Sequence, residues 1–258
     1  MAGQFNKEYK YTNIGTVVGT LCYFKPLERK DGSQYGGEFL INVQGHGSVN
    51  VRVPNMAKVE EILNEFPVEN RPHVRVSMTQ VDMFFAQTGK VYTNFTSFAP
   101  FKAVDETVAD TAKGNISGEV IKMKENGDGT MALLLAVYNV DKDNNLIKNY
   151  QGQPLPAKKI KIDIVEPQLV TQVKKEVQEG TNLIVGYSFV NKNDVRYDEY
   201  GLPVGSGERV TRVEAGKLIV NANGKKEEPV VENDPFGADP FGNNDPFAFD
   251  LGDEDVPF

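Results

Sequence analysis

Aromatic and basic side chains occur close together at several points in the first half of the chain. Phe84 and Phe85 cannot both point into a core if they lie on a strand, because neighbouring side chains on a strand face opposite ways. Exposed rings stack on unpaired bases, and basic side chains follow a phosphate backbone. The candidates for such contacts are Lys25, Arg29, Lys30, Tyr35, Arg52, Phe84, Phe85, Lys90 and Tyr92. This combination is typical of a surface that binds an unpaired nucleic-acid strand.

A similar set recurs in the second half. Its members are Tyr138, Lys159, Lys161, Arg196, Tyr197 and Tyr200. A single lysine is better explained as part of a solvated face, and Tyr138 also fits packing against a loop. Recurrence of rings with cations in corresponding places of both halves favours a binding role. Four other aromatic residues are expected in the core: Tyr23, Phe24, Phe95 and Phe98.

Alternating apolar and polar residues predict five strands and one helix in residues 1–105. The predicted strands are 11–25, 38–44, 49–53, 74–79 and 90–101. Residues 56–66 have apolar side chains at helical spacing, with Asn55 as the N-cap and Pro67 after the end. The helix therefore lies between the third and fourth strands.

The same order recurs about a hundred residues later, a period that is typical of repeated domains. Residues 106–114 are polar and small and are expected to form a linker. The next predicted strands begin at Asn115 and continue with 131–140, 158–165, 183–190 and 209–220. The second helix has Pro167 in its first turn and Gly180 after its end.

Five strands with a helix between the third and fourth is the order of the OB-fold, a small Greek-key barrel. We therefore predict a mainly β protein with two tandem OB-fold barrels. The expected boundaries are 1–105 and 115–222 for the barrels, 106–114 for the linker and 223–258 for a tail. A generic pair of α+β domains is the alternative. In an OB-fold, strands 2 and 3 and the loops joining strands 1–2 and 4–5 bind the ligand, and the candidate residues fall there.

Charge is distributed unevenly along the 258 residues. The chain has 28 basic and 36 acidic residues, a net charge of −8, and ten of the acids with two of the bases lie in residues 223–258. Residues 1–222 are therefore neutral and have room for a local positive groove. The tail is rich in Gly, Asn, Asp and Pro, and we expect it to be disordered because it buries too little apolar surface.

Several classes of protein lack support in the sequence. No apolar run is long enough to span a membrane, and the N-terminus has no apolar leader, so we expect a cytoplasmic protein. The single cysteine, Cys22, fits a reducing compartment. Two histidines, His46 and His73, are expected to be structural, and no metal site or other cofactor is indicated. Phosphate-loop, nucleophile-elbow and Cys-x-x-Cys motifs are absent, so nothing suggests an enzyme.

The tail has short motifs that combine acids with phenylalanine. Asp-Pro-Phe occurs three times, at 234–236, 239–241 and 245–247, and the chain ends in a further Pro-Phe pair. Such units suit docking into an apolar pocket with a basic rim, which can also capture the terminal carboxylate. The expected partner-binding residues at the end of the chain are Asp253, Glu254, Asp255, Val256, Pro257 and Phe258.

This ending resembles the acidic tip of bacterial single-stranded DNA-binding proteins, which end in Asp-Asp-Asp-Ile-Pro-Phe. The resemblance implies that the tip recruits replication, recombination and repair proteins and can fold back on the DNA-binding groove. Tryptophan and the usual bacterial N-terminal sequence are absent, and two barrels replace one. The chain is therefore expected to be a divergent member, encoded by a phage or mobile element and acting in the host cytoplasm as a monomer or dimer.

We accordingly expect the protein to coat single-stranded DNA without sequence preference. Two alternatives are open at this point. The Asp-Pro-Phe repeats also look like peptides that endocytic adaptor appendages bind, which would make the chain a scaffold. An OB-fold protein that binds RNA is the other alternative.

Overall fold

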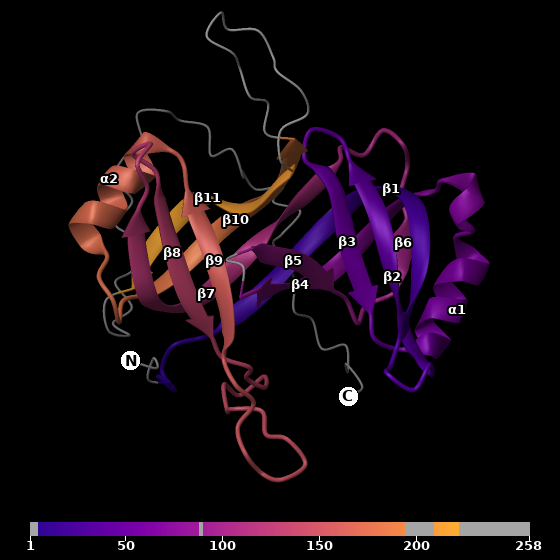
Figure 1. The fold of residues 1–258 in the computed structure, drawn as a ribbon, viewed down its shortest axis with the longest axis horizontal. Helices are drawn as coiled ribbons and strands as arrows, with labels where there is room; N and C mark the ends of the chain where they lie inside the picture. The colour runs from indigo at the N-terminus through magenta and orange to yellow at the C-terminus, as the bar shows by residue number, and fades with distance from the viewer. Residues whose placement is uncertain (1–4, 88–89, 194–208, 222–258) are drawn as a thin grey trace, which may run out of the picture. The chain divides into compact units, whose positions relative to one another are not determined.

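Strand pairing joins the described residues of the computed structural model, which are 5–87, 90–193 and 209–221, into one eleven-stranded sheet (Figure 1). The strands in the first half are β1 (Thr12–Glu28), β2 (Gln34–Val43), β3 (Gly47–Val53), β4 (His73–Phe85), β5 (Val91–Thr96) and β6 (Phe101–Ala103). Those in the second half are β7 (Thr111–Glu125), β8 (Met131–Val137), β9 (Lys158–Ile164), β10 (Asn182–Asn193) and β11 (Arg209–Asn221). The helices are α1 (Met56–Glu65), η1 (Val68–Asn70) and α2 (Pro167–Glu176).

The strands of the first half close into a five-stranded barrel, the first ring. Its order is β1-β2-β3-β5-β4, and antiparallel pairing of β1 with β4 closes it. All neighbours are antiparallel except β3 and β5, which are parallel. Inward side chains of this ring include Phe39, Ile41, Val49 and Val51, which are fully buried. A closed barrel with this strand order is consistent with the predicted OB-fold.

The strands of the second half repeat this pattern in a second ring. Its order is β7-β8-β9-β11-β10, closed by antiparallel pairing of β10 with β7. The parallel neighbours are again the third and fifth strands, β9 and β11, which pair where Asp163 lies opposite Glu214. Strand order and helix position are therefore the same in both rings.

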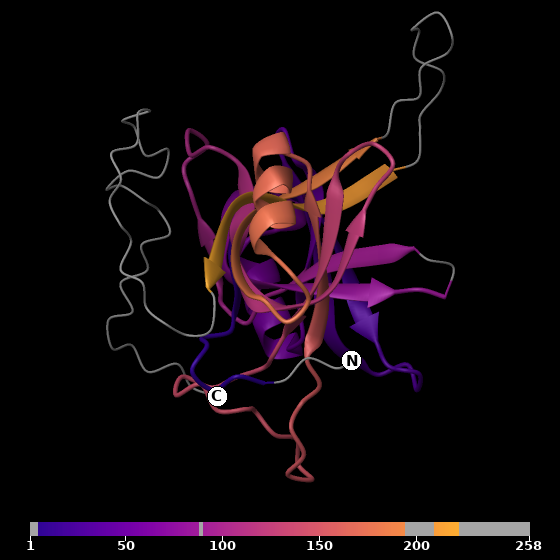
Figure 2. The same cartoon turned by 90° about the vertical axis from the view of Figure 1, so that its left-hand side faces the viewer.

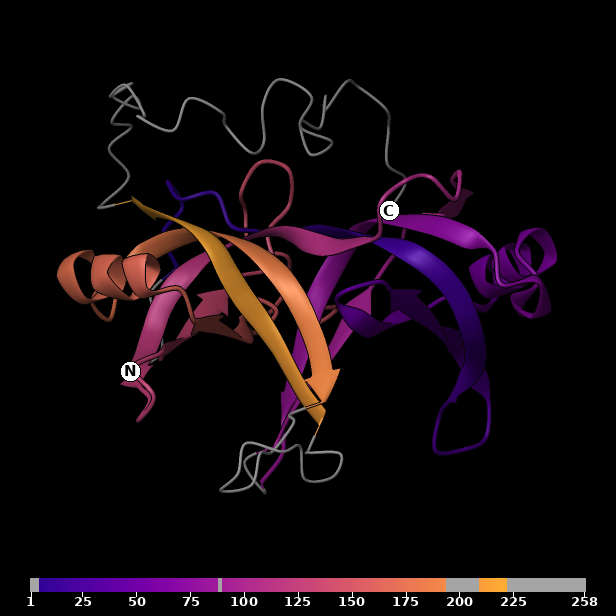
Figure 3. The ribbon, with the colours of Figure 1, turned by 90° about the horizontal axis from the view of Figure 1, so that it is seen from above.

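Each helix lies between the third and fourth strands of its ring, as predicted, and the two helices lie on opposite sides of the joined rings (Figures 1 and 3). The side chain of Asn55 caps α1 by accepting a 3.2 Å hydrogen bond from the Lys58 amide. Helix α2 begins at Pro167, which has no amide hydrogen to leave unpaired. The apolar face of each helix is buried against its ring.

The loops that join the first two strands of each ring contain the same turn. In the first, Asp31 accepts hydrogen bonds from the amide (2.9 Å) and hydroxyl (2.6 Å) of Ser33, and in the second Asp128 accepts from Thr130 at 3.0 and 2.7 Å. These hydrogen bonds lower the pKa of both carboxyl groups. The glycine after each aspartate has a φ of +82°, which is accessible to glycine without strain. The shared turn is local evidence that the two halves are repeats.

Several predicted strand limits are wrong; the fourth strand, predicted at 74–79, extends to Phe85. The strand predicted at 90–101 is divided into β5 and β6, because the Ser97 hydroxyl accepts a 3.2 Å hydrogen bond from the Ala99 amide and turns the chain there. Strand β7 begins at Thr111, although its start was predicted at Asn115. The segment 106–114, expected to be a linker, therefore includes four residues of a strand.

The extra residues of β7 join the two rings. Thr12–Val18 of β1 pair antiparallel with Thr111–Ser117 of β7, and Gly15 lies opposite Gly114 at the centre of this seam. A Cβ atom on Gly15 would lie 2.5 Å from the Tyr187 hydroxyl oxygen and 2.9 Å from the Lys113 carbonyl oxygen. A Cβ atom on Gly114 would likewise meet the Ile14 carbonyl oxygen. Glycine is therefore required on both sides of the seam, because any side chain would force the strands apart.

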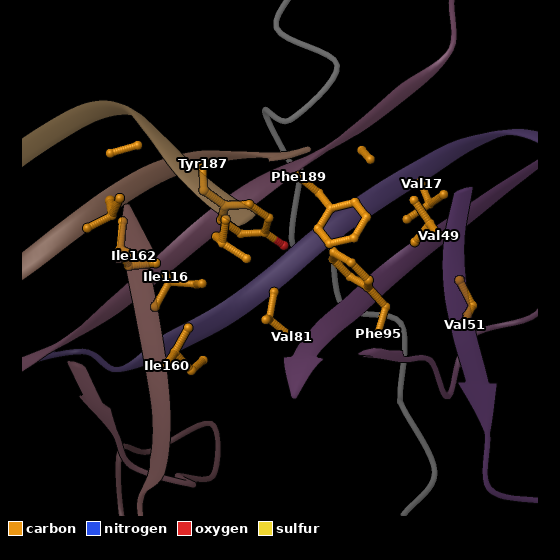
Figure 4. Packing of buried hydrophobic residues seen from close by; sticks show 14 of the residues in the cluster. Val17, Val49, Val51, Val81, Phe95, Ile116, Ile160, Ile162, Tyr187 and Phe189 are labelled. Carbon is orange, nitrogen blue, oxygen red and sulfur yellow. The ribbon is translucent and has the colours of Figure 1, made fainter. Parts of the chain in front are cut away.

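The buried side chains of the two rings form one continuous hydrophobic core. At the seam, Phe95 of β5 packs edge-on against Phe189 of β10, with ring centroids 5.1 Å apart (Figure 4). Tyr187 lies beside them and is almost fully buried, which raises the pKa of its hydroxyl. The two rings therefore share their packing as well as a line of backbone hydrogen bonds.

The segments that precede β1 and β7 each pack on the opposite ring. Before β1, the Tyr9 hydroxyl donates a 2.5 Å hydrogen bond to the Leu183 carbonyl oxygen, and the Asn144 amide donates to the Tyr9 carbonyl oxygen at 2.8 Å. Before β7, Asp110 accepts a 2.6 Å hydrogen bond from the Gln44 amide. Each half of the chain therefore completes the surface of the other ring.

We predict that Gly15→Ala destabilises the protein by about 1–3 kcal/mol, as overpacking of a tight core does. The new methyl group would meet the Tyr187 hydroxyl and the Lys113 carbonyl oxygen. Thermal unfolding checks this, since each kcal/mol lowers the melting temperature by roughly 2–4 °C in a domain of this size. Gly127→Ala is the matched control, because no atom lies within 4 Å of its added Cβ. Equal melting temperatures for the two variants would contradict this account of the seam.

Candidate nucleic-acid interface

The hairpin formed by β4 and β5 presents three of the predicted aromatic residues, and we call it the aromatic hairpin (Figure 2). Phe84 lies opposite Tyr92 across the two strands, and their ring centroids are 6.4 Å apart. Phe84 is 64 % exposed, Tyr92 52 % and Phe85 40 %. Phe85 faces the other side of the hairpin, as strand geometry requires. These aromatic side chains could stack on a base without giving up many contacts with the protein, because few such contacts exist.

The loop between β1 and β2 holds a second group of predicted residues. The Arg29 guanidinium lies over the Tyr35 ring, 5.6 Å from its centroid, so this ring is already paired with a cation. Lys25, on β1, and Lys30, in the loop, are also exposed. The structure therefore brings Lys25, Arg29, Lys30 and Tyr35 together at one hairpin, as the sequence predicted.

A row of outward side chains crosses the face between this loop and the aromatic hairpin. Strand registers place the members of the row side by side, in the order Lys25, Glu38, Arg52, Thr96 and Gln80. Arg52 donates a 2.8 Å hydrogen bond to Glu38, and both side chains remain partly exposed. The charge of Arg52 is therefore partly balanced by Glu38.

Two aromatic residues that were expected in the core are exposed. Tyr23 is 58 % exposed because a bulge at Cys22 shifts the register of β1 and turns Tyr23 outward. Phe98 is 55 % exposed and follows β5 where the chain leaves the sheet. The other two predictions are supported: Phe95 is buried, and Phe24 packs against Phe39 with centroids 5.1 Å apart. Tyr23 and Phe98 therefore join the candidate stacking residues, and a bulge of this kind leaves no clear signal in sequence.

The second ring presents cations on its outer face. Lys159 is exposed, and Lys161 forms a 2.7 Å ion pair with Asp163. Lys122 lies opposite Leu134, which in turn lies opposite Lys161, and Lys124 is one step further along β7. Sequence reasoning missed Lys122 and Lys124, although their alternation along a predicted strand is a usable signal. The face also carries the acids Glu119 and Glu214, so its positive charge is moderate.

Tyr138, predicted to stack on a base, lies in an aromatic cluster with the segment before β1. Its ring centroid is 5.0 Å from that of Tyr11 and 5.4 Å from that of Phe5. Burial raises the pKa of Tyr138 and that of Tyr11. The packing alternative considered from the sequence is therefore the arrangement that the structure shows for this ring.

Of the remaining predicted residues, one lies on the aromatic hairpin and the others lie outside the described residues. Lys90 is exposed near the tip of the aromatic hairpin, where its carbonyl oxygen accepts a 2.9 Å hydrogen bond from the Ala86 amide. Arg196, Tyr197 and Tyr200 lie outside the described residues, as do the six residues at the end of the tail, 253–258.

Both histidines contact other parts of the chain: His46 Nδ1 is 2.9 Å from the Phe189 carbonyl oxygen, and His73 Nε2 is 3.4 Å from Asp110.

Other kinds of site find no support in the part of the chain that the structure describes. Within residues 5–87, 90–193 and 209–221, no group of three or more His, Cys, Asp or Glu side chains is arranged to hold a metal ion. In the same ranges, no helix is long and apolar enough to cross a membrane.

Comparison with known proteins identifies the fold. The chain is similar to the single-stranded DNA-binding protein of Thermus aquaticus, with a TM-score of 0.51 and 13 % identity over 84 % of this chain and 96 % of that one. A deletion mutant of the same protein matches with a TM-score of 0.52 and 12 % identity, over 85 % of this chain and 98 % of the mutant. No protein-family model matches the chain, and neither does any curated protein. At this identity the likeness concerns the fold, and it extends across both rings.

We predict that Phe84→Ala leaves the melting temperature nearly unchanged, because the ring is mostly exposed. Phe95→Ala, three residues after Tyr92 on β5, is the matched comparison and removes a buried ring. Its expected loss is about 3–5 kcal/mol of stability. Thermal unfolding monitored by circular dichroism measures both. A large drop for Phe84→Ala would show that the aromatic hairpin depends on this ring for its own structure.

Proposed function

We propose that the protein binds single-stranded DNA without sequence preference and protects it during replication, recombination or repair. The exposed aromatic hairpin on a closed five-stranded barrel is the observation that carries this proposal. The likeness in fold to a single-stranded DNA-binding protein supports it. We further propose that both rings are OB-folds, because they have the same strand order, closure and helix position.

Binding would combine two kinds of contact. Bases would stack on Phe84, Tyr92 and Tyr23, each stacked base contributing about 1–3 kcal/mol. The cations at the β1–β2 loop would follow the phosphates, which are common to every sequence. None of these contacts reads the edge of a base, so the site would not discriminate between sequences.

We propose that the acidic tail recruits other proteins to the coated strand. Its repeated Asp-Pro-Phe units and its terminal Phe258 are suited to docking in apolar pockets with basic rims. The same negative charge would compete with DNA for the cations of the two rings, because a tethered segment has a high effective concentration.

The first test is a titration of labelled poly(dT) at two salt concentrations. We expect affinity to fall with salt, since phosphate contacts release counterions, with a logarithmic slope of about −0.7 for each contact on a single strand. Phe84→Ala and Tyr92→Ala should each weaken binding, and so should Phe85→Ala. Tyr150→Ala is the matched control, because Tyr150 is 95 % exposed on the β8–β9 connection, outside the proposed interface.

The outcome of this titration also separates the alternatives. Stronger binding of poly(U) than of poly(dT) would favour an RNA-binding protein. Binding of neither polymer would contradict the proposed function and favour a scaffold that presents Asp-Pro-Phe peptides.

The second test is deletion of residues 223–258, which removes ten acidic and two basic residues. We expect affinity for poly(dT) to be preserved or raised, most clearly at low salt, and partner recruitment to be lost. Phe258→Ala is the matched control, because it keeps the side-chain charges and should affect recruitment alone. Weaker DNA binding by the truncated protein would argue against competition by the tail.

A further inference from the structure

The two rings can be compared residue by residue, because their first strands contain the same irregularity. One extra residue, Cys22, interrupts the pairing of β1 with β2, and one extra residue, Ile121, interrupts the pairing of β7 with β8. Superposing the two bulges places Lys122 at the position that Tyr23 occupies in the first ring. The outward side chains of the two rings can then be matched along the strand registers.

Lys122 begins a row of outward side chains that crosses the second ring. It lies opposite Leu134 of β8, which lies opposite Lys161 of β9. Arg212 of β11 continues the row, because Lys161 and Arg212 each lie two residues before the pair that joins these parallel strands. Three of the four strands in this row therefore contribute a cation.

The corresponding row of the first ring contains no charged side chain. Its members are Tyr23, Leu40, Asn50 and Asn94. Two residues before Lys161 on the third strand, Lys159 occupies the position that Ser48 has in the first ring. The two rings therefore share their backbone pairing and differ in the chemistry of the same outer surface.

Strand β8 contributes apolar side chains to this surface of the second ring. They are Ala132, Leu134 and Ala136, which lie between β7 and β9 in the register. In the first ring the position of Ala132 is occupied by Glu38, which forms the ion pair with Arg52. Along these described residues of β8, no acid therefore separates the lysines of β7 from those of β9.

Three lysines of this surface have charges that no acid balances. Lys122, Lys124 and Lys159 are exposed, and within the described parts of the chain none of them forms an ion pair. A lysine ammonium on its flexible stem binds phosphate as a point charge. These side chains are therefore available to the backbone of a nucleic acid.

Acids partly balance two further cations of the surface. Lys161 forms a 2.7 Å ion pair with Asp163. Hydrogen bonds from Thr130 lower the pKa of the Asp128 carboxyl group, and the charge of Arg212 lowers it further. The exposed lysines therefore supply most of the charge that can attract a phosphate.

Exposed aromatic side chains are distributed in the opposite way. On the described barrel strands they belong to the first ring and include Tyr23, Phe84 and Tyr92. From β7 onward, the exposed aromatic side chain among the described residues is Tyr150, which lies on the β8–β9 connection and not on a barrel strand. The described strands of the second ring therefore offer cations without exposed rings.

We propose that this surface of the second ring, the lysine face, holds the phosphates of single-stranded DNA without stacking on its bases. The lysine face consists of Lys122, Lys124, Lys159, Lys161 and Arg212. Its ligand is the sugar–phosphate chain, whichever bases that chain carries, while the first ring stacks the bases. This inference rests on the proposed binding of single-stranded DNA and divides its two kinds of contact between the two rings.

The test uses the full-length protein and two ligands that differ in their bases alone. One is an oligonucleotide of about thirty thymidines, close to twice the roughly 16 nucleotides that an OB-fold can cover, and the other is an abasic oligonucleotide with the same number of phosphates. The unmodified protein should bind both, and the thymidine ligand more tightly because stacking adds to its affinity. Fluorescence anisotropy at several salt concentrations gives the affinity and the salt slope for each ligand.

Variants of the two rings should affect these ligands differently. Phe84→Ala should lower the affinity for the thymidine ligand by about 5- to 150-fold, the equivalent of one lost stack, and leave binding of the abasic ligand unchanged. The double variant Lys122→Gln/Lys159→Gln should lower the affinity for both ligands by the same factor. It should also reduce the salt slope by about 1.4, which is two phosphate contacts at about 0.7 each.

Lys148→Gln/Lys175→Gln is the matched control for the lysine variant. It removes the same charge from two exposed lysines, one on the β8–β9 connection and one on α2, and should leave the salt slope unchanged. Melting temperatures equal to that of the unmodified protein check that both double variants fold.

Three results would overturn the lysine face. They are a salt slope that Lys122→Gln/Lys159→Gln leaves as the control does, a loss of affinity in that variant that is larger for the thymidine ligand than for the abasic one, and no binding of the abasic ligand by the unmodified protein. If the unmodified protein binds the thymidine ligand in these cases, the proposed function stands. Failure to bind the thymidine ligand would instead overturn the proposed function, and the lysine face with it.

Discussion

The antiparallel pairing of β1 with β7 is the constraint on which the rest of the structure depends. Because Gly15 lies opposite Gly114 with no room for a side chain, the two strands approach closely enough to continue one sheet from ring to ring. The shared core around Phe95 and Phe189 follows from this approach. So does the position of β9 beside β4, where Lys158 forms an ion pair with Asp82.

Much of the architecture could be predicted from the sequence. Apolar alternation is visible in Phe39, Ile41 and Val43 and again in Ile160, Ile162 and Ile164, and helical spacing is visible in α1 and α2. These patterns are local and arise from which side chains face a core, so they can be recognised without knowing what packs on the other side. The repetition of strand order in both halves strengthened the prediction of the fold.

The parts that could not be predicted depend on contacts between distant residues. Thr111–Gly114 is polar and small, like a linker, and it forms a strand because β1 supplies its hydrogen-bonding partner. The bulge at Cys22 turns the Tyr23 side chain outward, whereas regular alternation along β1 would point it into the core. Tyr138 does not stack freely, because the segment before β1 crosses to the second ring and packs Tyr11 against it. Whether an aromatic side chain is exposed depends on the residues that pack on it, and those residues are distant in the sequence.

The seam between β1 and β7 also determines whether the two barrels stay together when the protein is diluted. Its register is symmetric about Gly15 and Gly114, with Thr12 opposite Ser117 and Val18 opposite Thr111, as in an isologous contact between two identical subunits. Here both barrels belong to one polypeptide, so they meet at a fixed effective concentration. Two separate chains would come apart on dilution, because their association depends on concentration. This chain keeps its paired barrels at any abundance, and each barrel is free to diverge from the other.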